Sequence, residues 1–542
     1  MIRKPTGLLL TGVVAGAVGV GCEERPYDLI IEGGQVLDGT GTDAVEADVA
    51  VEGYRIVDVG DLSEAPAERR VDATGLHVAP GFIDPHSHAS GGLQDESRSP
   101  ARALVAQGIT TAFINPDGGG SVEIEEQQEA LMEHGLGVNV AQFVPHGSAR
   151  TTAMDGSHAR APTEGEMEEM RNLVREGMEA GAFGLSTGLF YTPGDYAETS
   201  EIVELARVAA EYDGVHSSHI RDESDYTVEV VNAVQEIIDI SREADIAGVV
   251  SHVKALGPNV WGESREIVRR IEEARAESVE VWADQYPYDA SATGFTAALV
   301  SSWARDGGGS ALRRRMEDPE LAERIRDDIQ ENLERRGGAH RIMFRSGEGL
   351  EGRTLEEVAE EAEADPVDTA FELIREGQAG GIISFNMDEE DIERLMRQPW
   401  TLTSTDGGLP EFGQGTPHPR TYGAFPRKIR EYVLERGVVD LPFAVHSMTG
   451  LTAQAFRLDQ RGELRAGAYA DVVVFDLDRV NDPATFMEPH QYAEGMEHVL
   501  VNGTLVVDEG EFTDALPGRA LRLHDPDRMP GPDLIARAES RD

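Results

Sequence analysis

The chain has 542 residues and is 40% apolar, so it is long enough for one large domain with a buried core and a smaller partner domain. Its 100 Asp and Glu residues outnumber 48 Lys and Arg, which leaves a formal net charge of −52. Because a surface this acidic repels phosphate backbones, we expect no nucleic acid partner. The acidic residues are spread along the chain, which favours a solvated, salt-adapted surface over a single binding patch.

Residues 1–22 have the pattern of a signal peptide. Basic residues precede an apolar run over residues 8–20, and Cys22, the only cysteine in the sequence, follows it. The run is too short to span a bilayer comfortably, and this arrangement is typical of export. A cysteine at this place resembles the lipidated residue of a bacterial lipoprotein, although Gly19 stands where a larger aliphatic residue is usual. We therefore expect an extracytoplasmic protein anchored to the membrane through Cys22, with a plain signal peptide as the alternative.

Residues 23–80 alternate apolar and polar side chains in short runs separated by glycine. The same alternation of apolar and polar residues recurs within residues 456–525. A period of two interrupted by glycine predicts strands and turns. We expect the two ends of the chain to pair into one small β-sandwich, with a tail over residues 526–542.

Residues 81–455 alternate short apolar strands with longer charged helices. Helices are predicted near residues 122–134, 227–244 and 264–276, and strands near residues 138–144, 247–251 and 279–283. Many such units with continuous apolar strands predict an α/β protein whose parallel strands close into a (β/α)₈ barrel of the TIM type. An open doubly wound sheet is the alternative, but no GxGxxG loop follows the first strand. A charged helical stretch over residues 312–336 is expected to form a lid or a flank.

Two histidines close the first strand of this region, in Gly81-Phe-Ile-Asp-Pro-His-Ser-His88. Residues i and i+2 of an extended strand project to the same side, so His86 and His88 can hold one cation together. The carboxyl end of a barrel strand is also where active sites lie. His219 and His252 end two later strands in the same way. The four histidines predict a metal site, and imidazole ligands suit zinc.

A carboxylate candidate, Asp406, ends a late strand in Leu402-Thr-Ser-Thr-Asp-Gly-Gly408. An aspartate before glycine is commonly a turn former, but the apolar strand before it favours a functional carboxylate. We expect Asp406 to act as a metal ligand and as a general base. Lys254 lies two residues after His252 and so points to the same side of the strand. The sequence contains lysine only at positions 4, 254 and 428. We interpret Lys254 as a substrate-binding residue, with a buried ion pair inside the barrel as the alternative.

These motifs resemble the amidohydrolase superfamily, and within it the N-acyl-D-amino acid deacylases (D-aminoacylases), from about residue 27 to about residue 522. Further marks of the resemblance are GAFGLSTGLFYTPG from residue 181, ADQYPY from residue 283, STDG from residue 404, HPRTYG from residue 418 and RGELRAGAYADVVVFD from residue 461. The resemblance implies a metal-dependent hydrolase that cleaves the amide bond of an N-acyl-D-amino acid. It also implies a cofactor of one or two zinc ions.

The resemblance implies a role for each ligand candidate. It assigns one metal position to His86, His88 and Asp406, and a second to His219 and His252. The bridging ligand of the family is commonly a cysteine in Asn-Cys-Gly, whereas this chain reads Asn115-Pro-Asp-Gly118. We therefore expect Asp117 to bridge the two positions, with a role as a turn residue as the alternative. The departure leaves the number and preference of the metal ions open.

The resemblance also implies how a small acidic substrate binds. Lys254, Tyr286 and Arg420 are expected to clamp the α-carboxylate, and Tyr191 to line the side-chain pocket. Arginine offers a bidentate fork to a carboxylate, lysine a point charge and tyrosine a neutral donor. One alternative is a cyclic amidase of the dihydroorotase or hydantoinase type, or a dipeptidase, relatives that often carry a carboxylated lysine between two metals. Another is a lipoprotein that binds a metal or ligand without catalysis.

Overall fold

The computed structural model describes residues 25–156, 158–378 and 380–524. The predicted signal peptide with Cys22, and the tail over residues 526–542, lie outside these described residues. Within them, no helix combines the length and the apolar character that crossing a membrane requires.

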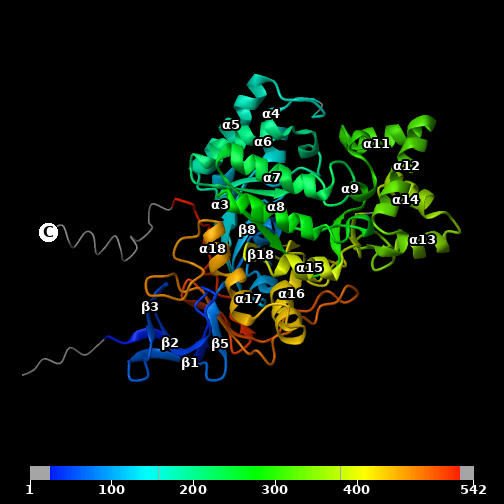
Figure 1. The fold of residues 1–542 in the computed structure, drawn as a ribbon. Helices are drawn as coiled ribbons and strands as arrows, with labels where there is room; N and C mark the ends of the chain where they lie inside the picture. The colour runs from blue at the N-terminus through cyan, green and yellow to red at the C-terminus, as the bar shows by residue number, and fades with distance from the viewer. Residues whose placement is uncertain (1–24, 157, 379, 525–542) are drawn as a thin grey trace, which may run out of the picture.

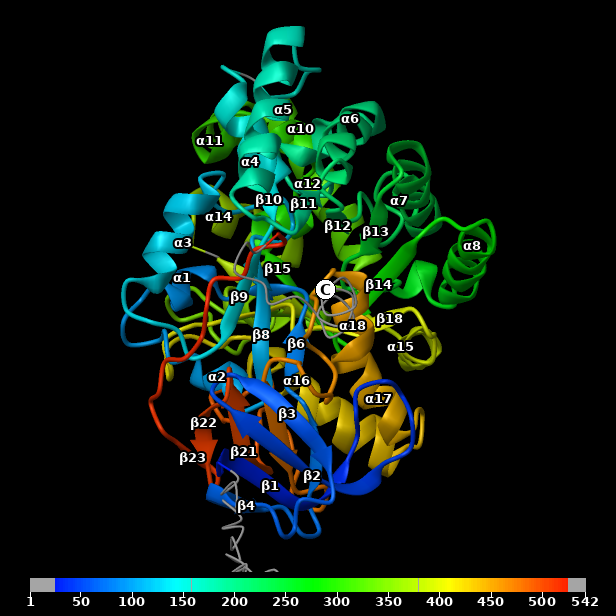
Figure 2. The same cartoon turned by 90° about the vertical axis from the view of Figure 1, so that its left-hand side faces the viewer.

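The centre of the molecule is a closed barrel of parallel strands, as predicted (Figure 2). Neighbouring strands pair in parallel from β6 to β9 and from β10 to β18. The ring closes where β19 (Gly407–Gly408) pairs with β7 (Ser87–His88). Among the described residues the barrel strands are β6 (Phe82–Asp84), β8 (Ile109–Ile114), β9 (Asn139–Gln142) continued by β10 (Val144–Pro145), β11 (Gly184–Gly188), β12 (Val215–His219), β13 (Ala247–Val250), β14 (Val281–Gln285) and β18 (Thr401–Thr403).

A buried carboxylate also joins the first and last barrel strands. Asp84 accepts hydrogen bonds from the backbone N–H of Thr405 at 2.9 Å and from its hydroxyl at 2.6 Å. Because Thr405 directly precedes Asp406 and Asp84 lies two residues before His86, this contact sets two predicted metal ligands side by side.

Helices surround the barrel and bury one apolar face each. In α7 (Val230–Ala244), Val230, Ala233, Val234 and Ile237 are buried, which is the spacing of one helical face. The observed bounds lie within a few residues of the predicted ones. The other helices around the barrel are α1 (Ser90–Leu93), α2 (Arg102–Val105), α3 (Ile124–Met132), α4 (His146–Ala153), α5 (Glu164–Glu179), α6 (Thr199–Ala210), α8 (Ser264–Ala276), α15 (Glu389–Met396), α16 (Arg420–Arg427), α17 (Leu441–Met448) and α18 (Gly450–Ala455).

Strands from the N-terminal and C-terminal parts of the described residues form one β-domain below the barrel, as predicted (Figure 1). The central pairing is antiparallel and joins β5 to β20, with Val78 opposite Val474. The strands form one continuous sheet, and Val473 and Phe475 belong to the core shared with the barrel. Its strands are β1 (Tyr27–Val36), β2 (Val45–Glu52), β3 (Arg55–Gly60), β4 (Ala67–Asp72), β5 (His77–Pro80), β20 (Val472–Phe475), β21 (Met496–Val501), β22 (Thr504–Asp508) and β23 (Glu511–Phe512).

An insertion between β14 and β18 forms a separate lobe beside the barrel (Figure 1). It has its own core around Phe295, Ile329 and Phe344. The stretch over residues 312–336 lies mostly in two of its helices, α11 (Gly308–Glu317) and α12 (Pro319–Arg335). The lobe contains an antiparallel sheet of β15 (Ser291–Gly294), β17 (Gly381–Ser384) and β16 (Ile342–Phe344), with α9 (Phe295–Leu299), α10 (Ser302–Arg305), α11 (Gly308–Glu317), α12 (Pro319–Arg335), α13 (Leu355–Glu361) and α14 (Pro366–Glu376).

Candidate metal centre and active site

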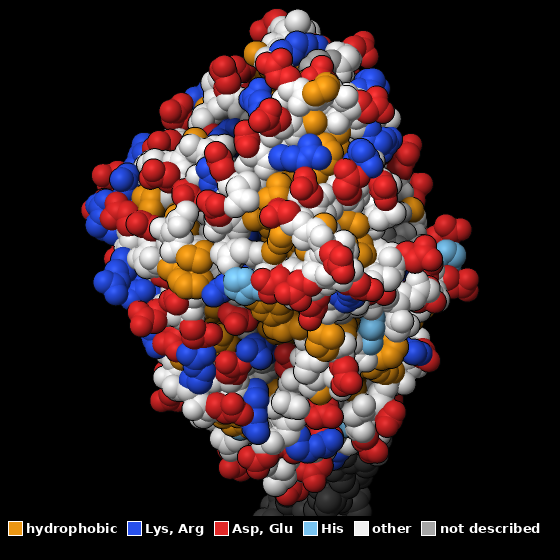
Figure 3. All heavy atoms as spheres, turned by 90° about the vertical axis from the view of Figure 1, so that its right-hand side faces the viewer, with side chains coloured by type: hydrophobic (Ala, Val, Ile, Leu, Met, Phe, Trp, Pro, Cys, Tyr) orange, Lys and Arg blue, Asp and Glu red, His pale blue; other side chains and the backbone are white. Residues whose placement is uncertain are grey.

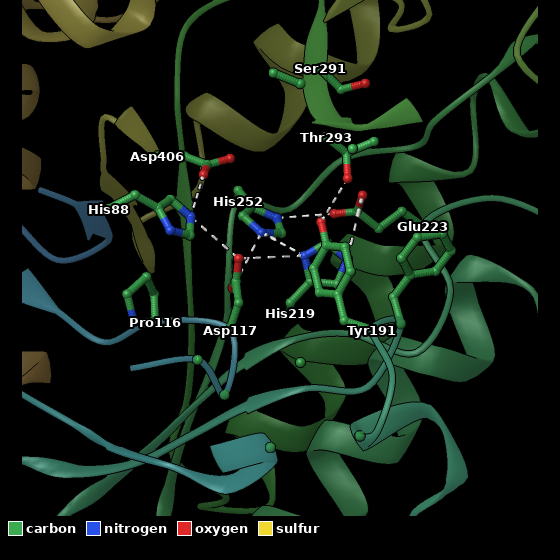
Figure 4. A pocket seen from close by; sticks show the side chains of 18 of the residues that line it. His88, Pro116, Asp117, Tyr191, His219, Glu223, His252, Ser291, Thr293 and Asp406 are labelled. Carbon is green, nitrogen blue, oxygen red and sulfur yellow. Dashed lines mark hydrogen bonds and ion pairs between the residues drawn. The ribbon is translucent and has the colours of Figure 1, made fainter. Parts of the chain in front are cut away.

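A cavity of about 850 Å³ opens at the carboxyl ends of the barrel strands. Strand β15 of the insertion supplies part of its wall through Ser291 and Thr293. The stretch that was expected to form a lid or a flank therefore belongs to a lobe that borders the cavity. Side chains from distant strands meet on the barrel side (Figure 4). These are His88, Asp117, His219, His252, Lys254 and Asp406.

The first predicted metal position is assembled around two histidines and two carboxylates. The Nε2 atom of His88 lies 3.2 Å from Oδ1 of Asp406 and 3.4 Å from Oδ2 of Asp117. The Nε2 atom of His86 lies 3.7 Å from Oδ1 of Asp406 and 3.4 Å from Oδ1 of Asp117. His86, His88 and Asp406 thus offer ligand atoms within 4.8 Å of one another, close enough to share one ion.

The second position adjoins the first through Asp117. The Nδ1 atom of His219 lies 2.9 Å from Nε2 of His252. The carboxylate of Asp117 lies 4.0 Å from His219 Nδ1 and 3.7 Å from His252 Nε2. Asp117 therefore faces histidines of both positions, which is the arrangement that a bridging ligand requires.

The donor set fits a metal ion. Both ring nitrogens of His86, Oδ1 of Asp117 and Nε2 of His219 are buried and have no hydrogen-bond partner among the described residues. A buried polar atom without a partner is costly unless something else satisfies it. Imidazole nitrogens with carboxylate oxygens are a usual zinc environment. These atoms are therefore preorganised to receive a cation.

Three of the predicted ligands have strained backbones. Asp117, His252 and Asp406 adopt φ angles of 55°, 35° and 46°, in a region that residues other than glycine rarely occupy. Such strain costs about 1–3 kcal/mol per residue and persists where function requires it. In each case the chain leaves β geometry at the end of a strand, which turns the side chain toward the shared site.

Opposing charges keep both carboxylates ionised. Burial acts to raise the pKa of Asp406, but the charges of Arg420 and His252 outweigh it and hold the pKa well below its usual range. Burial likewise acts to raise the pKa of Asp117, and the surrounding histidines reverse the effect. The ionised forms are those that bind a cation.

Lys254 lines the cavity and forms a buried ion pair with Glu223. The ion pair that was the alternative role for this lysine is therefore present, and the lysine also faces the cavity. Its Nζ atom also lies 2.8 Å from Nδ1 of His252. Sequence reasoning missed Glu223, which lies four residues after His219 in the loop beyond β12. The only feature of the sequence that could have indicated Glu223 is its position shortly after a histidine that ends a strand.

The predicted carboxylate clamp is assembled around the ring of Tyr286. The guanidinium carbon of Arg420 lies 4.5 Å from the ring centroid of Tyr286, and Nζ of Lys254 lies 5.6 Å from it. Tyr191 also lines the cavity, with its hydroxyl 3.2 Å from the Thr293 hydroxyl of the insertion. The structure therefore brings all four predicted substrate residues to the walls of one cavity.

Asp284, at the end of β14, is a second residue that sequence reasoning missed. Its Oδ1 accepts a hydrogen bond from the backbone N–H of His252 at 2.9 Å. Its Oδ2 lies 3.9 Å from Nδ1 of His86. Its place in the ADQYPY motif, at a strand end, was the available signal. Asp284 therefore holds the backbone of His252 by a hydrogen bond and lies near His86 without bonding to it.

The chain is similar to known proteins in both sequence and structure. The model of the amidohydrolase family matches residues 69–507. A D-aminoacylase of Alcaligenes xylosoxydans xylosoxydans is 37% identical, over 92% of this chain and 98% of its own length. An N-acyl-D-glutamate deacylase of the same organism is also 37% identical, over 92% and 97%. The crystal structure of an N-acyl-D-glutamate deacylase from Bordetella bronchiseptica, complexed with zinc and a phosphonate that mimics the tetrahedral intermediate, superposes with a TM-score of 0.78 at 34% identity, covering 92% of this chain and all of that one.

Proposed function

The chain belongs to the amidohydrolase family, and we propose that it is a zinc-dependent deacylase that releases a carboxylic acid and a D-amino acid from N-acyl-D-amino acids. One observation carries this proposal: Asp117 and Asp406 face His86 and His88 at 3.2–3.7 Å in a cavity that also presents Lys254. Metal ligands and a substrate-binding cation thus share one space. The similarity to deacylases over nearly the whole chain supports the same activity.

The proposed metal ligands are His86, His88, Asp117, His219, His252 and Asp406. Zinc, when bound there, supplies a water whose pKa is lowered to about 7 and polarises the scissile carbonyl. The Asp406 carboxylate takes one proton from the attacking water and passes it to the departing amine nitrogen. The hydroxyl joins the acyl carbon, the C–N bond breaks, and the products are a carboxylic acid and an amine. Asp284 keeps His252 in place during this exchange.

Substrate orientation follows from the charges around Tyr286. We assign Lys254 and Arg420 to the α-carboxylate of the substrate, with the Tyr286 hydroxyl as a neutral donor. Glu223 holds the Lys254 ammonium in the wall of the cavity, which limits the entropy that Lys254 loses on binding. The acyl amide then lies toward the metal ligands, which adjoin Lys254 through His252 and Arg420 through Asp406.

The cyclic amidase alternative receives less support. Its relatives often carry a carboxylated lysine between two metals, but Lys254 is paired with Glu223. The other lysine among the described residues, Lys428, donates to the hydroxyls of Thr403 and Ser447. Asp117 occupies the place between the two histidine sets. A linear amide is therefore the substrate that we propose.

A substrate panel tests the function. Zinc-reconstituted protein should hydrolyse N-acetyl-D-amino acids at least about 100-fold faster than their L-enantiomers, dipeptides or hydantoins, measured as amine release. The Asp406→Asn variant controls for contaminating hydrolases. Faster hydrolysis of hydantoins or dipeptides would contradict the deacylase assignment, and metal binding without hydrolysis of any amide would favour a binding protein.

We also propose that the protein is exported and anchored through Cys22. The basic residues, the apolar run and the cysteine support this localisation. Expressed in a bacterial host, the wild type should fractionate with membranes and incorporate labelled fatty acid, whereas the Cys22→Ser variant should not be labelled. Labelling that persists in Cys22→Ser, or a wild type that stays unlabelled in the cytoplasm, would refute the anchor.

A further inference from the structure

The surface of this protein is itself rich in groups that attract cations. Figure 3 shows Asp and Glu side chains spread over the side of the molecule that lies on the right in Figure 1. Solvated carboxylates of this kind attract divalent cations without fixing their geometry. Retention of zinc at one place therefore depends on how firmly the buried ligands are held.

Each of the three ligands with a left-handed backbone needs a group that holds that backbone. For His252 this group is Asp284, which accepts a hydrogen bond from the His252 N–H. For Asp406 the contact is made by the preceding residue, whose N–H donates to the carboxylate of Asp84. Among the described residues, no carboxylate holds the backbone of Asp117 in this way. A different group must therefore fix the position of this ligand.

The carboxylate of Asp117 does not fix its own position. Its polar partners among the described residues are all histidines of the metal centre, at 3.4–4.0 Å: His86, His88, His219 and His252. These distances are longer than those of ordinary hydrogen bonds between nitrogen and oxygen. The place of the carboxylate between the two histidine sets is therefore set by the backbone of its loop.

One hydroxyl group in β11 brackets Asp117. Ser186 is fully buried, and its hydroxyl donates a hydrogen bond of 2.6 Å to the carbonyl of Asn115. The same hydroxyl oxygen accepts a hydrogen bond of 3.2 Å from the backbone N–H of Gly118. The first partner lies two residues before Asp117 and the second directly after it. The loop that carries Asp117 is thus closed around a single oxygen atom.

The start of this loop is held from another side as well. The side-chain amide of Asn115 donates to Oε1 of Gln127 at 2.8 Å and accepts from its Nε2 at 3.1 Å. A Cβ atom at Gly120 would lie 2.5 Å from Oδ1 of Asn115, so the loop folds directly over this pair of amides. Asn115 is therefore a fixed point, against which Ser186 sets the position of Gly118.

Strand β11 also approaches the loop too closely for the loop to move toward it. A Cβ atom at Gly188 would lie 2.1 Å from the carbonyl oxygen of Asp117. A Cβ atom at Gly118 would lie 2.9 Å from the backbone nitrogen of Gly188. Close packing thus blocks a shift toward β11, and the two hydrogen bonds of Ser186 oppose a shift away from it.

We propose that Ser186 is a positioning residue of the metal centre, whose hydroxyl keeps Asp117 in its left-handed conformation and the bridging carboxylate between the two histidine sets. The inference rests on the metal ligands of the proposed function, and it does not depend on the substrate. Without this hydroxyl, the carbonyl of Asn115 and the N–H of Gly118 lose their common partner. The loop then relaxes, and zinc is bound less tightly.

The zinc affinity of Ser186→Ala tests the proposal. Ser217→Ala is the matched control, because Ser217 is the partner of Ser186 in the register of β11 and β12, is also buried, and contacts the Ser251 hydroxyl at 3.0 Å. Competition with a chelator in about 0.5 M salt, which screens the exposed carboxylates, measures zinc binding. Ser186→Ala should bind zinc about 10- to 100-fold more weakly than the wild type, and Ser217→Ala within about threefold of it, because groups that orient metal ligands contribute to affinity on this scale.

Two further measurements separate positioning from folding. With zinc removed, Ser186→Ala and Ser217→Ala should unfold within about 4 °C of each other, because each loses one buried hydroxyl. Added zinc should then raise the Tm of Ser186→Ala less than that of Ser217→Ala, since ligand binding stabilises the folded state in proportion to affinity. In the Asp117→Ala background, Ser186→Ala should change zinc affinity by less than about threefold, because no bridging carboxylate is left to position.

The outcomes distinguish this inference from the proposed function. A wild type that binds no zinc overturns the proposed metal centre and this inference with it. Tight zinc binding that is equal in Ser186→Ala and Ser217→Ala overturns the role of Ser186 alone. A full loss of affinity that recurs in the Asp117→Ala background does the same, since Ser186 would then act on another ligand. If Ser186→Ala does not fold, Gln127→Met releases the other anchor of the loop, and an unchanged zinc affinity in that variant overturns the inference.

Discussion

The Nη1 atom of Arg420 lies 2.7 Å from Oδ2 of Asp406. Arg420 begins α16, and Asp406 follows the last strand of the barrel. The side chain assigned to the substrate carboxylate therefore touches the side chain assigned to proton transfer. Under the proposed function, this contact sets the distance between the bound end of the substrate and the base.

Asp406→Asn should retain most of the bound zinc and lose turnover by at least about 10²- to 10⁴-fold, the range of general base catalysis. Asparagine keeps an oxygen for the metal, but it cannot accept the proton of water. Zinc content by elemental analysis and kcat for an N-acetyl-D-amino acid measure the two effects. Asp368→Asn, on an exposed helix of the insertion, serves as the matched control. Full activity in Asp406→Asn would remove the base assignment.

Asp117 is expected to connect the two metal positions, so Asp117→Ala should lose metal. Asp117→Cys should retain zinc and bind it more tightly relative to manganese, because a thiolate is a softer ligand than a carboxylate. Competition with a chelator, followed by measurement of metal content, tests both variants. If Asp117→Ala holds zinc as tightly as the wild type, Asp117 is a turn residue and not a bridge.

Glu223→Gln should destabilise the fold by about 3–5 kcal/mol, because it leaves the buried Lys254 ammonium without its carboxylate. The double variant Glu223→Gln, Lys254→Met removes both charges and should recover much of that loss. It should still turn over poorly, since the cation assigned to the substrate is gone. Thermal unfolding of the single and double variants measures the coupling. Strictly additive losses would show that the pair does not interact.

We expect Lys428 to make the free energy of unfolding depend on pH in the neutral to alkaline range. Burial lowers its pKa to about 7 in the folded protein, whereas in the unfolded chain the pKa is about 10.4. Below pH 7 both states carry the proton, and the full penalty of a buried ammonium weighs on the fold. Between about pH 7 and pH 10.4 the folded state loses its proton first, so the penalty is relieved as pH rises, by up to about 1.4 kcal/mol per pH unit.

Lys428→Met should therefore be more stable than the wild type near pH 6.5, and the difference should shrink toward pH 9.5. Thr403 and Ser447 keep each other as hydrogen-bond partners, with their hydroxyl oxygens 3.1 Å apart. Thermal unfolding at three pH values measures the difference. Arg430→Met, a neighbouring arginine with a partly exposed side chain, should show no such trend. A constant difference between Lys428→Met and wild type would exclude the titration.

Much of this protein could be predicted from local sequence patterns. Alternating apolar strands and charged helices indicate the barrel, because a strand buried on both faces needs a continuous apolar run. The His-x-His spacing places His86 and His88 on one side of one strand, because successive side chains alternate in direction. These inferences concern residues that are close in sequence, where the geometry of the backbone alone sets the relation.

Only the tertiary structure decided which residues face one another across the barrel. The pairing of Lys254 with Glu223 and the support of His252 by Asp284 join segments separated by tens of residues. Periodicity does not encode such contacts, since they depend on how strands align and on loops with left-handed backbones at Asp117 and Asp406. The sequence determined the kind of chemistry, and the packing of the barrel and its insertion determined the arrangement of charges around the cavity.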